Sequence, residues 1–182
     1  MGRIVSTFFM SLDGVVESPH LFHMPYFDEE MGRVMTDYQA STTAYLLGRQ
    51  LYSEWSQHWP GNTEDDFGPW ISALPKYVLS GSLTEATWEN TELVTGDDDE
   101  VAAAVQRIKD TTEGDIGMSG CATTVGWLLR HGLVDELVLF VDPVLVGTGR
   151  RLFEHPDQHV PLTLVGSEVL PTGVHVVRMA PA

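Results

Sequence analysis

The chain has 182 residues, of which 43% are hydrophobic and 20% charged, so we expect one globular domain over residues 1–182 with a sizeable core. Its 26 acidic and 10 basic side chains give a formal net charge of −16, which repels polyanions and argues against a nucleic-acid partner. One cysteine excludes an internal disulfide, and the sequence shows neither a signal peptide nor an apolar run of about 20 residues, so we expect a cytoplasmic protein outside the membrane.

The first elements are a predicted strand, a long loop and a helix. Residues 3–10 are rich in β-branched and aromatic types and stop at the turn-prone pair Asp13–Gly14. The loop over residues 15–26 carries prolines, histidines and aromatic side chains, a composition typical of a binding loop. Asp28 is a plausible N-cap for a helix whose apolar residues recur at helical spacing, namely Phe27, Met31, Val34, Met35 and Tyr38.

The middle of the chain alternates strands with helices. Residues 44–47 predict a strand that ends at Gly48–Arg49 and leads into a short helix. A polar loop over 59–66 and a helical turn at 70–74 precede a strand at 76–80, which ends at Gly81. Leu93–Val94 predict a further short strand, and the acidic run 97–99 caps a helix with an apolar face.

The last third predicts a strand, a helix, a buried strand and a hairpin. Residues 115–119 lead through Gly120 into a helix that closes at Arg130–Gly132. Residues 137–141 are apolar throughout, as in a strand covered on both faces, and 162–165 and 174–177 flank a turn. The order predicts an α/β fold with a mostly parallel sheet, helices on both faces and a C-terminal antiparallel hairpin.

Four predicted strands end in glycine-containing turns, and these turns suggest a ligand cleft. They lie at Gly14, Gly48, Gly81 and Gly120, and Gly147–Gly149 is a fifth candidate. Ligands of open α/β sheets bind outside the carboxyl ends of the strands. Gly120 is the most informative, because it precedes a helix N-terminus that can receive a pyrophosphate, although neither a Rossmann nor a P-loop glycine motif is present.

Several segments together resemble a known family. The segments SLDG (11–14), LLGRQLY (46–52), LPKYVLS (74–80), SGCATTVGWLL (119–129) and GLVDEL…DPVLVGTGRRLF (132–153) occur in this order. They resemble the riboflavin-biosynthesis reductase domain, the C-terminal half of the bifunctional deaminase-reductase, within the dihydrofolate reductase-like superfamily, and more narrowly its stand-alone bacterial members. A zinc deaminase half is excluded, because one cysteine cannot supply its ligand set.

The resemblance implies NADPH as cofactor, with NADH as the alternative. It places Gly48, Arg49, Ser80 and Ser82 near the adenosine phosphates. The pyrophosphate would lie at the segment 120–124, with Val146 and Gly147 nearby; the binding residues implied there are Gly120, Ala122, Thr123 and Thr124. Related reductases often carry an arginine directly after the strand-ending serine, where this chain has Gly81, so Arg49 and the serine hydroxyls would have to hold a 2′-phosphate.

Two aspartates are candidates for handling the proton that accompanies hydride transfer. Asp13 resembles the aspartate of the riboflavin reductases, and Asp28 resembles the acidic residue with which dihydrofolate reductases hold a pterin; turn formation and N-capping are the alternative roles. Phe22, Tyr26 and Trp55 are candidates for stacking on a flat substrate.

No metal site is expected. The pairs His20/His23 and His155/His159 have suggestive spacing but no third ligand, so we interpret them as surface histidines. Cys121, at the start of a helix, is interpreted as a small packing residue.

The sequence thus predicts an NADPH-dependent reductase of a small planar heterocycle, similar to 5-amino-6-(5-phosphoribosylamino)uracil reductase. The alternatives are a pterin or dihydrofolate reductase, and a non-catalytic nucleotide-binding or dimerisation module of the same fold. The family also implies a homodimer, built on the strand 137–141 or on the last hairpin.

Overall fold

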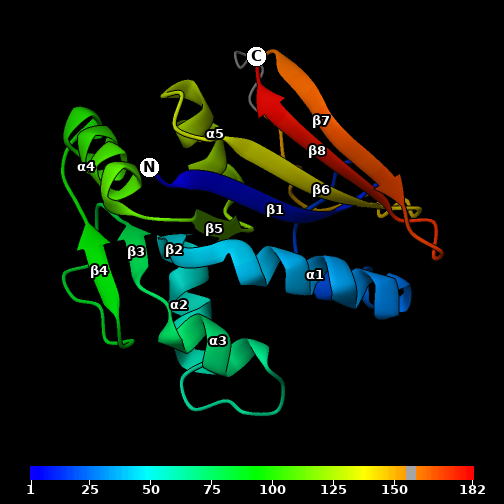
Figure 1. Ribbon diagram of the computed structural model, residues 1–182, viewed down its shortest axis with the longest axis horizontal. Coiled ribbons are helices and arrows are strands. Elements are labelled where there is room, and N and C mark those ends of the chain that lie inside the picture. Colours follow the sequence, from blue (N-terminus) through cyan, green and yellow to red (C-terminus); the bar gives the residue numbers. More distant parts are fainter. Residues whose placement is uncertain (155–158) are drawn as a thin grey trace.

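A computed structural model describes residues 1–154 and 159–182, and its strands form one eight-stranded sheet (Figure 1). The strand order is β4-β3-β2-β5-β1-β6-β8-β7. The pairings among β1 to β6 are all parallel, whereas β8 pairs antiparallel with both β6 and β7. The strands are β1 (Arg3–Ser11), β2 (Thr42–Gly48), β3 (Lys76–Leu79), β4 (Thr91–Val94), β5 (Asp115–Ser119), β6 (Glu136–Asp142), β7 (Leu162–Val169) and β8 (His175–Pro181). The predicted parallel sheet with a C-terminal hairpin is confirmed.

Helices cover both faces of this sheet, as predicted (Figure 1). The helices α4 (Asp98–Thr111) and α5 (Ala122–Arg130) lie on one face, and α1 (Glu29–Ser41), α2 (Arg49–His58) and α3 (Phe67–Ala73) lie on the other. Two short 3₁₀ turns, η1 (Pro19–Leu21) and η2 (Met24–Tyr26), interrupt the loop after β1.

The side-chain period of the strands divides the core between these two faces. On β2, Ala44 and Leu46 pack with the residues of α4 and α5, whereas Tyr45 and Leu47 pack with those of α2 and α3. Successive side chains of a strand point to opposite faces, so a continuous apolar run gives a strand that is buried on both sides. All four of these side chains are at most 2% exposed.

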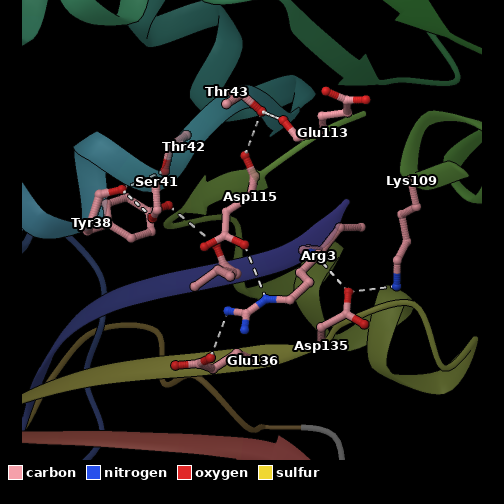
Figure 2. Close-up of polar contacts among 12 residues, drawn as sticks. Arg3, Tyr38, Ser41, Thr42, Thr43, Lys109, Glu113, Asp115, Asp135 and Glu136 are labelled. Atoms are coloured by element: carbon pink, nitrogen blue, oxygen red, sulfur yellow. Dashed lines mark hydrogen bonds and ion pairs between the residues drawn. The ribbon is translucent and has the colours of Figure 1, made fainter. Parts of the chain in front are cut away.

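Ion pairs tie the amino ends of the central strands together (Figure 2). The Arg3 guanidinium lies 3.1 Å from a carboxylate oxygen of Asp115 on β5 and 3.0 Å from one of Glu136 on β6. Beside them, Lys109 Nζ lies 2.6 Å from Asp135 Oδ2 and donates to the carbonyl oxygen of Leu133. These contacts fix β1, β5 and β6 at one edge of the sheet and therefore set the positions of their carboxyl ends at the other.

The position of the last strands bears on the predicted homodimer interface. The strand 137–141 is the interior of β6, which is hydrogen-bonded to β1 and β8, whereas β7 is an edge strand with Leu164, Val165 and Val169 more than half exposed. Of the two segments considered, only the hairpin therefore offers a free strand edge. None of the helices in residues 1–154 and 159–182 has the length and apolar character needed to cross a membrane.

Candidate functional site

A cleft of about 1060 Å³ lies at the carboxyl ends of the parallel strands. This is the edge at which open α/β sheets bind ligands. The strands β1, β2, β3 and β5 all contribute, together with α1, α2, α5 and the loops after β1 and β6. The lining residues used below are Thr7, Phe9, Glu17, His20, Met35, Gly48, Arg49, Glu54, Trp55, His58, Trp59, Phe67, Ser80, Gly81, Ser119 to Thr124 and Arg150.

Two helix N-termini that no side chain caps face this cleft. The N-cap of α2 is Gly48, which has no side chain, and the N-cap of α5 is Cys121, whose side chain accepts no bond from the helix. By contrast, Asp28 caps α1 and Asp97 caps α4. The first N–H groups of a helix have no acceptor within it and carry the positive end of its dipole. The α2 and α5 N-termini therefore form a cradle for an anion.

Close packing fixes the two N-termini relative to each other. The Gly48 N–H donates to Cys121 Sγ over 3.2 Å, and a Cβ at position 48 would lie only 2.5 Å from Thr124 Oγ1. Only glycine permits this approach of β2 to α5. Burial raises the pKa of the Cys121 thiol to about 12, so the side chain packs as a neutral thiol.

An aromatic cluster forms one wall of the cleft. The rings of Trp55 on α2, of Trp59 at its C-cap and of Phe67 at the start of α3 have centroids 4.8 to 6.3 Å apart. Tyr45 lies behind them, with its centroid 5.7 Å from that of Trp55. Trp55 is seven residues beyond Gly48 along α2, so this wall begins about 10 Å from the helix N-terminus.

A chain of hydroxyl groups lies beside the aromatic wall. Tyr45 Oη donates to Ser119 Oγ over 2.5 Å, and Ser119 Oγ lies 2.7 Å from Thr7 Oγ1. Thr7 Oγ1 in turn lies 3.2 Å from the carbonyl oxygen of Met118, to which it donates. Burial raises the pKa of Tyr45 well above its ordinary value, so this phenol remains a donor. Thr7 and Ser119 line the cleft and offer hydrogen bonds to a bound molecule.

The structure brings part of the predicted site together. The cofactor candidates that line the cleft are Gly48, Arg49, Ser80, Gly120, Ala122, Thr123 and Thr124, and of the substrate candidates Trp55 lines it. Ser80 Oγ accepts from the N–H groups of Ser82 and Leu83, which orders the turn after β3. Ser82, Val146, Gly147, Phe22, Tyr26, Asp13 and Asp28 are not among the residues that line the cleft.

Asp13 anchors a loop in this structure. Its carboxylate accepts the Ser11 hydroxyl over 2.7 Å and the N–H groups of Val146 and Gly147 over 3.1 and 2.8 Å. These hydrogen bonds, that of Ser11 first, lower its pKa to about 2. The Val146 and Gly147 amides are therefore engaged with Asp13, which argues against their predicted place beside a pyrophosphate, and an ionised Asp13 is not a proton donor at neutral pH.

We expect Asp13→Asn to speed amide hydrogen exchange at Val146 and Gly147 by roughly tenfold, because hydrogen bonds to a charged acceptor are about twice as strong as neutral ones. The folded-state pKa of about 2 lies below the ordinary 3.8, so ionised Asp13 stabilises the fold above about pH 4 and this contribution is lost as the pH falls toward 2. Urea unfolding should therefore separate wild type from variant at pH 5 and less so at pH 2.5. Asp110→Asn, on the exposed side of α4, is the control; unchanged exchange at both amides would contradict the anchoring role.

Asp28 and the aromatic candidates of the loop also have structural contacts. Asp28 Oδ1 accepts from the Met31 N–H over 2.9 Å, so the alternative role of N-cap to α1 is confirmed. Tyr26 is half-buried against the core cluster that contains Val5 and Phe140. Phe22 is the C-cap residue that follows η1 and is half-buried as well.

The surface interpretation of His23 is wrong. His23 is only 3% exposed, its Nδ1 lies 3.0 Å from both carboxylate oxygens of the fully buried Asp142, and its ring stacks on Phe9 with centroids 3.8 Å apart. Phe9 lines the cleft, so this dyad holds the loop after β1 against the site. His20 and His159 are exposed, as expected, and His155 lies outside the described residues. Among the residues that the structure describes, no three His, Cys, Asp or Glu side chains gather as a metal site requires.

The sequence matches a known protein family over almost its whole length. The model of the family described as the RibD C-terminal domain matches residues 3–176. The chain belongs to this family. It is 28% identical over 177 residues to the uncharacterised protein YyaP of Bacillus subtilis strain 168, an alignment that covers 94% of this chain and 91% of that protein.

Solved structures share the fold. A protein of Shewanella sp. PV-4 assigned to riboflavin biosynthesis superposes with a TM-score of 0.72 at 17% identity, over 99% of both chains. Dihydrofolate reductase of Enterococcus faecalis, solved with NADP(H) and RAB-propyl, gives a TM-score of 0.60 at 17% identity, over 99% of this chain and 96% of that one. The fold is therefore dihydrofolate reductase-like, as the sequence resemblance implied.

Proposed function

We propose that the protein is a reductase that takes a hydride from NADPH, or from NADH, and delivers it to a small planar heterocycle, similar to the reductase step of riboflavin biosynthesis. The observation that carries this proposal is the pair of uncapped helix N-termini, of α2 and α5, on one cleft. In a chain of net charge −16, such a cradle gives an anionic dinucleotide a local site of positive potential.

The residues of the cleft fit a nicotinamide dinucleotide. The N–H groups that begin α2 and α5, with the Arg49 side chain, would hold the pyrophosphate, and Ser80 and Gly81 would lie along the adenosine part. The bound dinucleotide would supply the hydride, while the protein aligns it with the substrate. A dihydrofolate reductase of the same fold was solved with NADP(H), which supports this choice of cofactor.

The substrate would lie between the aromatic wall and the hydroxyl chain. Trp55 offers a π-face for a flat ring, and such contacts contribute beyond the buried area alone. Ser119 Oγ, which accepts from Tyr45, directs its own proton either to Thr7 or to an acceptor on the bound ring. These hydroxyls, rather than Asp13 or Asp28, are the polar groups that we assign to the reacting ring.

The first test is a titration of the purified protein with NADPH and with NADH, followed by tryptophan fluorescence. Trp55 and Trp59 line the cleft, so a bound dihydronicotinamide should quench them. Removal of a charge-assisted hydrogen bond costs about 1.5–3 kcal/mol, so Arg49→Ala should weaken binding by roughly ten- to a hundredfold. Arg107→Ala, on the exposed face of α4, should leave binding unchanged.

The outcomes of this titration distinguish a reductase from a non-catalytic module of the same fold. Binding of NADPH that is lost in Arg49→Ala supports the proposal and justifies assays with pyrimidine and pterin substrates. If neither dinucleotide binds, the reductase proposal fails, and a module that uses this fold without turnover becomes the better description.

A further inference from the structure

The positions of the basic side chains bear on the charge of the substrate. The sequence has ten of them, two lysines and eight arginines, and all lie in the described part of the chain. Both lysines are buried: Lys76 Nζ donates to three carbonyl oxygens at the end of α3, and Lys109 pairs with Asp135. Neither lysine is available to a ligand.

The arginines divide between ion pairs, outer helices and the cleft. Four bind carboxylates of the protein, namely Arg3, Arg33, Arg151 and Arg178. Arg107 and Arg130 lie on α4 and at the end of α5, and neither lines the cleft. Arg49 and Arg150 line it. Within the described residues the cleft therefore receives two of the ten cations.

These two arginines lie in different parts of the cleft. Arg49 is the first residue of α2, directly at the uncapped N-terminus. Arg150 lies on the loop after β6, where its N–H donates to Glu17 Oε2 over 2.9 Å, so a carboxylate lies beside this arginine. A nicotinamide dinucleotide brings a pyrophosphate, and NADPH adds a 2′-phosphate. The dinucleotide would thus occupy the part of the cleft that contains Arg49 and the two helix N-termini.

The remainder of the cleft has the opposite character. Its aromatic wall, Trp55, Trp59 and Phe67, presents π-faces, which carry negative electrostatic potential. Of the described lysines and arginines, only Arg150 lies in this part, whereas the carboxylates of Glu17 and Glu54 both line it, and both belong to exposed residues. This surface attracts a flat ring that is neutral or cationic and repels a phosphate, and the net charge of −16 adds to the repulsion.

We propose that the substrate is a planar heterocycle without a phosphate group, a free base or a nucleoside rather than a nucleotide. This inference rests on the proposed function, because it assigns Arg49 to the dinucleotide and leaves Arg150 beside the carboxylate of Glu17. It also distinguishes this chain from a reductase of phosphoribosylated pyrimidines, whose substrate carries a phosphate that the site must neutralise.

The test compares two probes that differ only in a phosphate. The protein is first saturated with NADPH and is then titrated at pH 8 with 5-amino-6-(ribosylamino)uracil and, separately, with its 5′-phosphate. Binding is followed by tryptophan fluorescence, because Trp55 and Trp59 line the cleft. We expect the unphosphorylated probe to bind at least tenfold more tightly. Equal binding, tighter binding of the phosphate, or binding of neither probe overturns the proposal.

A pair of charge-reversal variants locates the cause. Glu54→Arg should improve binding of the phosphorylated probe and reduce the ratio of the two probes' dissociation constants at least threefold. Glu113→Arg makes the same change of net charge at the opposite edge of the sheet (Figure 2) and should leave this ratio unchanged. Equal effects of both variants would also count against the proposal. The NADPH titration is read separately, so a failure to bind the dinucleotide is recognised as a failure of the proposed function.

Discussion

Thr123→Asp is expected to remove most dinucleotide binding without lowering the stability of the protein. Thr123 is an exposed residue in the first turn of α5, at the N-terminus that no side chain caps. An acidic side chain there interacts favourably with the helix dipole, which contributes about 0.3–1 kcal/mol to folding. The same carboxylate would lie where we place the pyrophosphate, and two like charges 4 Å apart repel each other by about 1 kcal/mol in water and about 4 kcal/mol near a protein surface.

The same substitution thus has opposite effects on the stability of the protein and on its affinity for NADPH, which distinguishes it from general damage to the fold. Taking about 2 kcal/mol of repulsion, the dissociation constant for NADPH should rise by roughly thirtyfold, while the melting temperature stays the same or rises. Thr123→Asn has nearly the same shape without the charge and should bind NADPH almost as wild type does. Wild-type affinity in Thr123→Asp would place the pyrophosphate elsewhere, and a lower melting temperature would show that the variant had damaged the helix.

The sequence was sufficient for the elements that depend on local patterns. Asp28 and Asp97 were recognisable as N-caps because each precedes an apolar periodicity, and both side chains do accept from the third residue that follows. The position of Gly120 between β5 and α5 was also recognisable, because a glycine between a buried strand and a helix is a local signal, and it does line the cleft. Arg49 was singled out by the family resemblance, because a lone arginine in a turn is not by itself a signal of a ligand cleft.

The parts of the site that the sequence did not show depend on contacts between distant segments. Thr7 and Ser119 lie opposite each other only because β1 and β5 pair in that register, 112 residues apart. His23 is buried because its loop folds onto Asp142, 119 residues away, and nothing in its own segment indicates that carboxylate. Asp13 was assigned to chemistry on its place after β1, whereas its role depends on the amides of a loop more than 130 residues later.

Gly117→Ala should destabilise the protein by about 2 kcal/mol, within the range of overpacked cores. Gly117 lies in β5 beneath the two tyrosines that support the site. A Cβ there would lie 2.7 Å from Tyr38 Oη, 2.7 Å from Tyr45 Cε2 and 2.8 Å from Thr42 Cγ2, distances that real Cβ atoms do not show. Tyr38 accepts from the Met118 N–H and Tyr45 donates to Ser119, so displacement of either ring breaks hydrogen bonds in a buried region.

The same substitution at another glycine provides the control with opposite sign. Gly32 lies in α1 with no atom within 4 Å of an added Cβ, so Gly32→Ala should stabilise by about 0.5–1 kcal/mol, because alanine loses less backbone entropy in a helix. For a chain of this size, the melting temperature should fall by roughly 4–8 °C in Gly117→Ala and rise by roughly 1–4 °C in Gly32→Ala. If the added Cβ collides with the Tyr38 hydroxyl, Tyr38→Phe should lower the stability less in the Gly117→Ala background than in wild type. Additive effects of the two substitutions would instead mean that the strand moves away from both rings, and the hydroxyl chain on which we place the substrate would then not depend on this glycine.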